Sequence, residues 1–335
     1  MKQNYVLGID IGGSEVKFGV VRFTDNNFEL LKVYSISTLK GKQNIDIMLR
    51  KILDEIVYIK DKFRNISCCG VGVAGIVDHK KGVVIMAPNV MWANFNLKKF
   101  FEEKIKLPVI IDNDANVASV GIYYSEILKK YPETKNIICF TLGTGIGGSV
   151  IVDREVLHGW NTSATEFGHI TIDPYTDKKC GCGNYGCLER FIGARWFVNN
   201  ISEEIKNNKV KTLISELVNN DLSKITAEIV YKSAVKKDKF AIEQWKVFGK
   251  YLGIAVGNLI NIFNPQVVVF TGGVAKAYRF FLPYVKKEVK LRLWPEVKFN
   301  KKYSLSDNVK YYICLSYKNY GVLGAAILAY NTYLL

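Results

Sequence analysis

The chain has 335 residues, of which 49% are apolar, and this stock of apolar side chains is sufficient for two ordinary α/β domains. The first residues form no secretory leader and no later stretch resembles a membrane span, so we expect a cytoplasmic protein without a membrane partner. The formal net charge of +15 would suit a nucleic-acid partner, but the lysines are spread over nearly every predicted helix surface and form no basic arm. A solvated basic surface therefore explains the charge better than a nucleic-acid partner does.

The first half of the chain alternates strand-like and helix-like segments. Apolar runs between turns predict strands at 5–10, 16–23, 28–37, 67–74 and 109–111, and amphipathic patterns predict helices at about 44–58 and 97–104. A further helix opens in the polar stretch 112–116. This alternation is typical of an α/β domain.

The second half repeats the opening pattern of strand, glycine-rich turn and strand. The repeat occupies 136–142 and 147–152; after it come a loop region, helices from about 188 and between 221 and 263, a strand at 267–270 and a closing helix rich in small residues. We infer two related α/β halves with a hinge near residue 117, because no long or low-complexity linker separates them.

Two of the strand connections carry the chemistry of a phosphate site. In the first, Asp10 ends an apolar strand and is followed by Gly12 and Gly13; in the second, Gly143–Gly148 connects two strands. Glycines permit positive φ and let backbone N–H groups approach a phosphate, and an aspartate beside them can hold the accompanying magnesium. For one turn alone an ordinary hairpin is the alternative, but one such turn in each half is what a phosphate clamp requires.

The second turn also matches the dinucleotide-binding pattern G-x-G-x-x-G, with glycines at 143, 145 and 148. That pattern needs a helix directly after the turn, whereas 149–152 has the composition of a strand, so we expect no dinucleotide site. A third glycine pair, Gly272 and Gly273, follows an apolar strand and precedes a helix, which suits the nucleoside end of ATP.

One histidine and three cysteines have the spacing of a structural metal site. They are His169, Cys180, Cys182 and Cys187. Together they form a closed set of nitrogen and sulfur ligands for tetrahedral zinc, with no position left for a catalytic water. Crowded thiols in a cytosolic chain suggest metal before disulfide, and three free cysteines in a loop are the alternative. The other four cysteines lie in apolar, strand-like surroundings, where cysteine packs as a small hydrophobic side chain.

Two glutamates flank these four residues in sequence. Glu166 lies three residues before His169, and Glu189 lies two residues after Cys187. A bound metal would therefore fix both carboxylates, which are suited to accept hydrogen bonds from sugar hydroxyls. Either glutamate alone can also be read as a surface charge.

The stretch Asp112–Asn116 contains the candidate general base. It ends a strand and begins a helix with four polar residues, whereas helix capping needs one. An aspartate there can accept a hydroxyl proton while the hydroxyl oxygen attacks a γ-phosphoryl group. We favour Asp114 over Asp112, although from the residues alone either can be the cap.

The combined motifs resemble the ROK family of repressors and sugar kinases, and the resemblance covers nearly the whole chain. It rests on Asp10–Lys17, Val73–Asp78, Ala87–Asn89, Asn113–Asn116, Gly143–Gly148, Glu166–His169 and Cys180–Glu189. The family implies a two-lobed α/β fold of the actin and hexokinase type, which is ribonuclease H-like, with the active site in the cleft between the lobes. On this basis we assign residues 1–117 plus about 320–335 to a smaller N-terminal α/β domain and residues 118–319 to a larger C-terminal α/β domain that carries the zinc site.

The resemblance also implies a role for each motif. Asp114 is the expected general base of an ATP-dependent hexokinase of the glucokinase type, with Mg²⁺ as a cofactor and Zn²⁺ as a structural ion. The expected sugar contacts are Gly75, Asn89, Asn113, Asp114, Glu166, His169 and Glu189, and His169 is expected to bind zinc through one ring nitrogen and the sugar through the other. The expected nucleotide contacts are Asp10, Gly12, Gly13, Ser14, Lys17, Thr144, Gly145, Gly272 and Gly273. Family members are often dimers or tetramers, so we expect a homo-oligomer.

A DNA-binding repressor is the main alternative within the family. A repressor of this type carries a helix-turn-helix module before the first glycine turn, and only nine residues precede Asp10. We therefore expect a kinase of carbohydrate metabolism that phosphorylates the 6-hydroxyl of a sugar.

The sugar itself is less closely defined by the motifs. Glucose is the first choice, because 74–78 and 87–89 are similar to glucokinases. N-acetylmannosamine, N-acetylglucosamine, fructose and mannose are the alternatives, because Ser163-Ala164-Thr165 departs from the family pattern at the floor of the sugar site. Ser14 stands where threonine is more usual, a change that removes no catalytic group.

Overall fold

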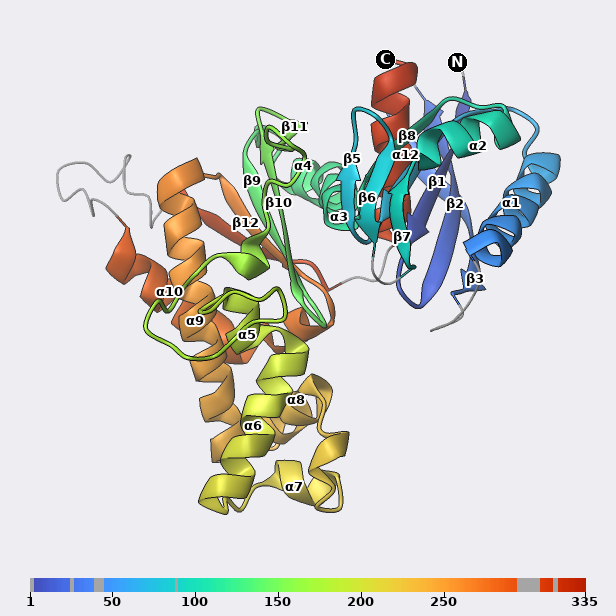
Figure 1. Cartoon of the computed structure of the whole chain (residues 1–335). Helices are drawn as coiled ribbons and strands as arrows, with labels where there is room; N and C mark the ends of the chain where they lie inside the picture. The colour runs from blue at the N-terminus through green and yellow to red at the C-terminus, as the bar shows by residue number, and fades with distance from the viewer. Residues whose placement is uncertain (1–2, 25–26, 39–44, 88–89, 294–307, 316–318) are drawn as a thin grey trace. The chain divides into compact units, whose positions relative to one another are not determined.

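The computed structural model describes residues 3–24, 27–38, 45–87, 90–293, 308–315 and 319–335 (Figure 1). The chain forms two compact units. The first unit comprises Met1–Glu133, Val156–Ala164 and Tyr317–Leu335, and the second comprises Thr134–Glu155 and Thr165–Ser316.

The first unit is built on a five-stranded sheet with the strand order β3-β2-β1-β4-β8. Its strands are β1 (Asn4–Ile11), β2 (Glu15–Thr24), β3 (Asn27–Ser37), β4 (Ile66–Val73) and β8 (Val109–Asn113). The first three strands form an antiparallel meander, and β4 and β8 run parallel to β1. Pairing of β8 with β4 carries the strand to Asn113, two residues beyond the predicted end at 111, because Gly72 and Val73 offer partners to Asp112 and Asn113.

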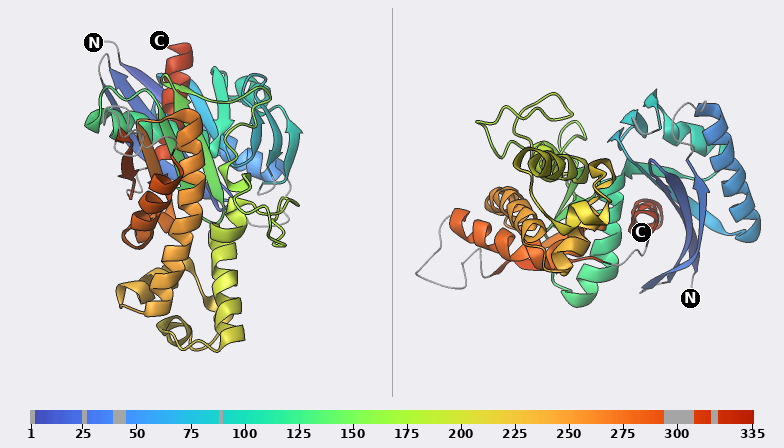
Figure 2. Two further views of the ribbon diagram at one scale, coloured as in Figure 1. Left: turned by 90° about the vertical axis from the view of Figure 1, so that its left-hand side faces the viewer. Right: turned by 90° about the horizontal axis from the view of Figure 1, so that it is seen from below.

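The two faces of this sheet follow the period of two expected of a strand. Apolar side chains such as Leu7 and Ile9 point to one face, where they share a core with α1 (Ile45–Lys62) and α2 (Leu97–Ile105). Glycines on the other face let α12 (Tyr320–Tyr333) lie directly on the strands: a Cβ added to Gly70 would lie 1.8 Å from the carbonyl oxygen of Ala325. Helices α1 and α12 thus cover opposite faces, as the right-hand view in Figure 2 shows.

The remaining elements of the first unit connect or pack against this sheet. They are the three-stranded sheet β5 (Ile76–Asp78), β6 (Val83–Ala87) and β7 (Trp92–Phe95), helix α3 (Asp114–Ile122), its π-helical extension Tyr123–Ile127 and α4 (Leu128–Lys130). Helix α3 packs closely on α12, because a Cβ added to Gly324 would lie 1.7 Å from the carbonyl oxygen of Val117. The small residues of the closing helix therefore permit close helix packing, as predicted.

The second unit is built on a five-stranded sheet with the order β11-β10-β9-β12-β13. Its strands are β9 (Ile137–Leu142), β10 (Ile146–Val152), β11 (Glu155–Val156), β12 (Val267–Thr271) and β13 (Lys310–Ile313). Strand β10 is antiparallel to β9, whereas β12 is parallel to β9 and β13 is parallel to β12.

Helices form the rest of the second unit. They are the 3₁₀ turn η2 (Phe167–His169), α5 (Leu188–Ile192), α6 (Ala194–Asn208), α7 (Leu213–Leu217), η3 (Leu222–Lys224), α8 (Ala227–Val235), α9 (Lys239–Phe263), η4 (Gly273–Ala277) and α10 (Tyr278–Arg292). The long helix α9 packs along α10, since a Cβ on Gly249 would lie 2.4 Å from the carbonyl oxygen of Phe281.

The two sheets share one topology. In each, an antiparallel strand pair is followed in the sheet by two strands parallel to the first member of that pair. The structure therefore confirms the mixed α/β fold predicted from the sequence and shows that the faint repeat of strand, turn and strand marks two units of one design.

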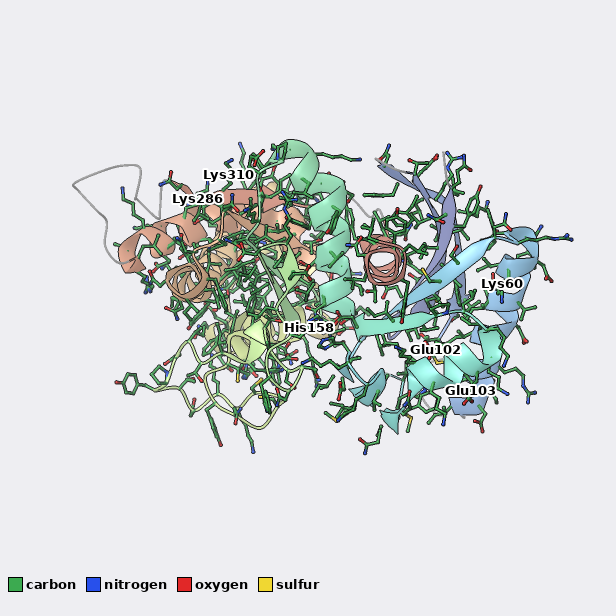
Figure 3. All side chains as sticks on the ribbon, turned by 90° about the horizontal axis from the view of Figure 1, so that it is seen from above. Lys60, Glu102, Glu103, His158, Lys286 and Lys310 are labelled. Atoms are coloured by element: carbon green, nitrogen blue, oxygen red, sulfur yellow. The ribbon has the colours of Figure 1, made fainter. Side chains whose placement is uncertain are left out.

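The basic side chains are distributed over many elements, as expected. Lys60 on α1, Lys286 on α10 and Lys310 on β13 illustrate this in Figure 3. Among the helices of the described ranges, none combines the length and the apolar content needed to cross a bilayer.

Candidate functional site

Asp10 is a half-buried carboxylate near the end of β1. It lies opposite Lys17 on β2 and beside Gly72 on β4, and Gly72 in turn lies beside Asp112 on β8. Helix α12 approaches it so closely that a Cβ on Gly321 would lie 2.3 Å from Asp10 Oδ2. Burial raises the pKa of Asp10 to about 6, with Lys17 opposing the shift and Glu15 adding to it. Ionised Asp10 is thus costly in this position, and a bound cation would offset that cost.

The turn that follows, Gly12–Ser14, is held by backbone hydrogen bonds. Gly12 N donates to Glu15 O at 3.1 Å, and Ser14 O accepts from Thr38 N at 3.0 Å. Neither glycine has a positive φ, and the same holds for Gly143 and Gly145 in the second turn. The positive φ that glycine permits is thus not used at these four positions. Gly143 leaves space at the backbone, since no atom lies within 4 Å of a Cβ built there, whereas a Cβ on Gly12 would lie 3.2 Å from Glu15 O.

Asn113 and Asp114 stand at the junction of β8 and α3. The Asn113 side chain caps the helix by accepting from Ala115 N at 2.8 Å, and its Nδ2 donates to Gly75 O at 2.9 Å. Asp114 is the first helical residue and is half-buried. Gly75, Asn113 and Asp114 are therefore neighbours within the first unit, whereas Asn89 lies outside the described residues.

Asp112 serves as a structural acceptor in the same junction. Its Oδ1 accepts from Asn113 N at 2.7 Å and from Asn116 Nδ2 at 2.9 Å, and the residue is 4% exposed. The helix cap is Asn113, so neither aspartate has the capping role considered for them. Asp114 Oδ1 in turn accepts from Ala115 N at 3.0 Å, and Asp114 stays the predicted base.

Glu189 joins the second glycine turn to the first turn of α5. Its Oε2 accepts from Ile146 N at 2.9 Å, and a Cβ on Gly145 would lie 2.3 Å from the same oxygen. Gly145 must therefore be a glycine for this carboxylate to reach its position. The predicted phosphate turn and one predicted sugar-binding carboxylate are in contact within the second unit.

His169, Cys180, Cys182 and Cys187, here called the metal cluster, converge in space. Their ligand atoms all lie within 4.8 Å of one another, with 3.7 Å between the sulfurs of Cys182 and Cys187 and 3.9 Å between Cys180 Sγ and His169 Nδ1. A tetrahedral zinc with Zn–S bonds of about 2.3 Å holds its sulfur ligands about 3.8 Å apart. Gly183 and Gly186, at φ of 97° and 72°, provide the left-handed turns of this tight loop. The four residues therefore fit a zinc ion.

His169 and Glu166 share one short 3₁₀ turn. Nδ1 of His169 faces the metal cluster, which leaves the opposite ring nitrogen, Nε2, on the other edge of the imidazole. Glu166 is exposed, and its carbonyl oxygen accepts from His169 N at 2.9 Å. A metal held by His169 would thus fix the backbone from which Glu166 projects. The remaining four cysteines (Cys68, Cys69, Cys139 and Cys314) are buried.

A pocket of about 400 Å³ lies beside the second glycine turn, within the second unit. Thr144 and Gly273 contribute to its lining, which brings the second and third predicted glycine turns together. Gly272, with φ of 93°, packs against Leu142 at the end of β9. The sequence did not predict the contribution of α8 and η4 to the lining, through Tyr231 and Lys276. The sequence feature nearest to this part of the lining is Thr226, the N-cap residue of α8.

Comparisons with known proteins agree with this arrangement. The model of the ROK family matches residues 6–332. A glucokinase of Halalkalibacterium halodurans is 32% identical over 328 residues, which cover 97% of this chain and 94% of that protein. A putative xylose repressor of Caldicellulosiruptor sp. is 30% identical over 288 residues, which cover 85% of this chain and 69% of the repressor. The crystal structure of a ROK family glucokinase from Streptomyces griseus, in complex with glucose and AMPPNP, superposes with a TM-score of 0.74 at 26% identity and covers 98% of this chain and 100% of that one. The chain is a member of the ROK family.

Proposed function

We propose that this protein is a cytoplasmic ATP-dependent hexose kinase that phosphorylates the 6-hydroxyl of glucose. The observation that carries the proposal is the contact of Glu189 with the second glycine turn. Glu189 Oε2 accepts from Ile146 N, while the residue itself follows Cys187 of the metal cluster by two positions. A carboxylate suited to a sugar hydroxyl and a turn suited to phosphate are therefore parts of one structure.

Asp114 is the proposed general base. As the sugar O6 attacks the γ-phosphorus, the O6 proton passes to the Asp114 carboxylate, a P–O bond forms to the sugar and the bond from the γ-phosphorus to the leaving oxygen of ADP breaks. Asn113 supports this step by fixing the helix start through its bonds to Ala115 N and Gly75 O. Magnesium would neutralise phosphate charge in this reaction, and Asp10, with its raised pKa, is the residue proposed to hold it.

The metal cluster has a structural role in the proposal. A closed His/Cys₃ set leaves zinc no free position for catalysis, so the ion would fix Glu166, His169 and Glu189 for sugar binding. The pocket beside Thr144 and Gly273 is the proposed nucleoside site, because it adjoins the turn proposed for the phosphates.

The choice of glucose rests on the relatives. The H. halodurans relative is a glucokinase, and the S. griseus structure contains glucose and AMPPNP. A coupled assay with ATP and glucose, mannose, fructose, N-acetylglucosamine or N-acetylmannosamine tests the proposal. The highest kcat/KM is expected with glucose; preference for another sugar would correct the substrate, and no turnover with any of them would overturn the hexokinase function.

A transcriptional regulator is the second candidate, because a putative xylose repressor is 30% identical over most of the chain. The two functions are separable by experiment. Fluorescence anisotropy with labelled promoter DNA, at physiological salt, is expected to show no sequence-specific binding, and specific binding without sugar phosphorylation would favour the regulator.

A further inference from the structure

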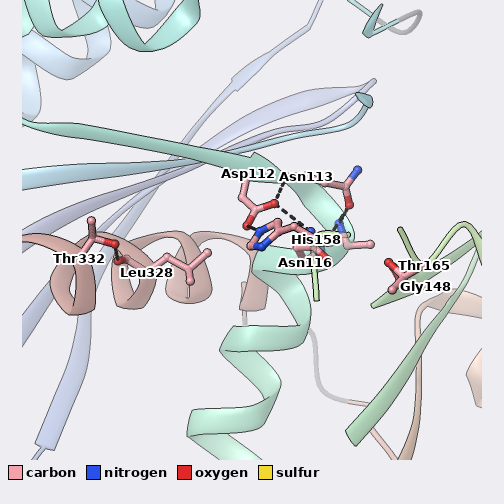
Figure 4. A network of polar contacts seen from close by, with 9 residues as sticks. Asp112, Asn113, Asn116, Gly148, His158, Thr165, Leu328 and Thr332 are labelled. Atoms are coloured by element: carbon pink, nitrogen blue, oxygen red, sulfur yellow. Dashed lines mark hydrogen bonds and ion pairs between the residues drawn. The ribbon is translucent and has the colours of Figure 1, made fainter. Parts of the chain in front are cut away.

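The segment Val156–Ala164 is anchored to the first unit by one histidine. His158 Nε2 lies 2.7 Å from Asp112 Oδ2, and the side chains of His158 and Asp112 are 21% and 6% exposed. Asp112 is the residue before Asn113, which caps the helix that begins with Asp114. The histidine is thus bonded to the strand end that carries the candidate base (Figure 4).

The carboxylate of Asp112 connects three parts of the first unit. Oδ1 accepts from Asn113 N at the end of β8 and from Asn116 Nδ2 in the first turn of α3, and Oδ2 pairs with His158. All of these atoms are buried or half-buried, so water competes weakly for the bonds. Loss of the His158 bond would leave a carboxylate oxygen of Asp112 without this partner in a buried position.

A second histidine, His79, packs against the ring of His158. The rings of His79 and His158 stack with their centroids 3.6 Å apart and an angle of 16° between their planes. Burial lowers the pKa of His79, and the neighbouring His158 lowers it further, against the opposing effect of Asp112. His79 therefore presents a neutral ring face to His158, and its buried Nδ1 has no hydrogen-bond partner among the described residues.

The anchored segment closes on itself directly after His158. Ala164 N donates to His158 O at 3.2 Å, and Gly159, with φ of 74°, makes the turn that permits this closure. Only Thr165 separates Ala164 from Glu166, the proposed sugar-binding carboxylate. The position of His158 therefore determines the position of Ala164, two residues before Glu166.

We propose that His158 is a positioning residue for sugar binding: its bond to Asp112 and its stack on His79 tie the start of the Glu166 segment to the strand end that carries Asp114. The proposal rests on the proposed function. It assigns Asp112 a purpose other than proton transfer, and it predicts that loss of the bond weakens sugar binding more than nucleotide binding.

Two substitutions of His158 distinguish the effect of its hydrogen bond to Asp112 from the effect of its stacking on His79. His158→Phe keeps an aromatic ring against His79 and removes the donor, whereas His158→Gln places an amide nitrogen near the position of Nε2. We expect His158→Phe to raise the KM and the Kd of glucose about tenfold, as for loss of one charge-assisted hydrogen bond, with the KM of ATP within about twofold of wild type. We expect His158→Gln to restore the glucose values to within about threefold of wild type.

Hydrogen exchange of full-length protein gives a readout that does not need turnover. The Ala164 amide, bonded to His158 O, is expected to exchange at least tenfold faster in His158→Phe than in wild type and at a near wild-type rate in His158→Gln. Unchanged glucose Kd and unchanged exchange in His158→Phe would overturn the proposal, as would an equal rise in the KM of glucose and ATP that His158→Gln does not relieve. If wild type binds glucose but transfers no phosphate, the proposed function fails, while the Kd and exchange comparison still decides the role of His158.

Discussion

The two units carry the same arrangement of strands but different chemistry at corresponding turns. In the first unit, the turn between β1 and β2 follows a half-buried aspartate, Asp10, whose charge is unfavourable in its surroundings. In the second unit, the turn between β9 and β10 has no carboxylate of its own and instead receives one, Glu189, from α5. In the proposed function, one topology thus supplies both a turn for a cation and a turn for phosphate and sugar, because the residues around each turn differ.

The proposed proton acceptor, Asp114, belongs to the first unit, so the largest expected effect is the loss of proton transfer when its carboxylate is removed. Asp114→Asn removes the proton acceptor but keeps the size and the helix position of the side chain, so kcat should fall by about 10²–10⁴-fold, the usual contribution of a general base. The Kd of glucose should change little, as measured by titration calorimetry. Asp54→Asn, on the exposed face of α1, is the matched control and should retain wild-type kcat. Full activity of Asp114→Asn would remove the general base from the proposal.

In the first turn, the charge of Asp10 should lower the stability of the fold, although the proposed magnesium binding needs that charge. The pKa of Asp10 is about 6 in the folded protein and 3.8 as its ordinary value. Between these values the folded state holds the proton and the unfolded state releases it, so the contribution of Asp10 to stability falls as pH rises from about 4 to about 6 and is constant above that. At pH 7.5 without metal, Asp10→Asn should therefore unfold at a higher temperature than wild type. Its free energy of unfolding should exceed that of wild type by up to about 3 kcal/mol.

Calorimetry in EDTA at several pH values tests this expectation. The stability gain of Asp10→Asn should shrink as the pH is lowered from 7.5 towards 4.5, because wild-type Asp10 then becomes neutral as well. The same variant should lose magnesium-dependent turnover. A variant that is less stable than wild type at pH 7.5 would contradict the unfavourable charge at this position.

In the second unit, removal of a metal ligand should affect sugar binding without affecting proton transfer. Cys182→Ala should lose the bound zinc, as measured by atomic absorption, and weaken glucose binding about 10–100-fold, the range seen when the support of a site is removed. Cys314→Ala, a buried cysteine outside the metal cluster, should keep both metal and sugar affinity. Zinc content and glucose Kd unchanged in Cys182→Ala would show that the cluster does not support the sugar site.

The smallest expected effect concerns the pocket beside the second turn. Tyr231→Ala removes an aromatic ring from the lining and should raise the KM of ATP about fivefold, the equivalent of roughly 1 kcal/mol of ring contact. The KM of glucose should stay within about twofold in the same steady-state experiments. An equal rise in both constants would mean that this pocket is not a nucleotide site.

The sequence predicted best what depends on neighbouring residues. The strands β1, β2 and β3 fall within one residue of their predicted bounds, because each is an apolar-rich run that ends at a turn. The metal cluster was found because its four ligands lie within 19 consecutive positions, 169–187. The short strands β5–β7 and β13 were missed, since three to five residues between loops carry too little periodicity.

Contacts between residues that are far apart in the chain could not be predicted from the sequence. His158 and Asp112 are 46 positions apart and meet only because the segment 156–164 returns to the first unit. The partners of Asp112 in the fold, Asn113 N and Asn116 Nδ2, likewise could not be read from the sequence. The pocket wall formed by α8 likewise depends on how the helices of the second unit pack.

The position of phosphate on the product decides whether this protein transfers phosphate to the sugar 6-hydroxyl. Wild-type protein incubated with ATP, magnesium and glucose should give one sugar phosphate for each ADP formed, and its phosphorus NMR signal should be split by the two protons of the C6 methylene group. Formation of ADP and free phosphate without a sugar phosphate, or a phosphorus signal coupled to a single ring proton, would contradict the account.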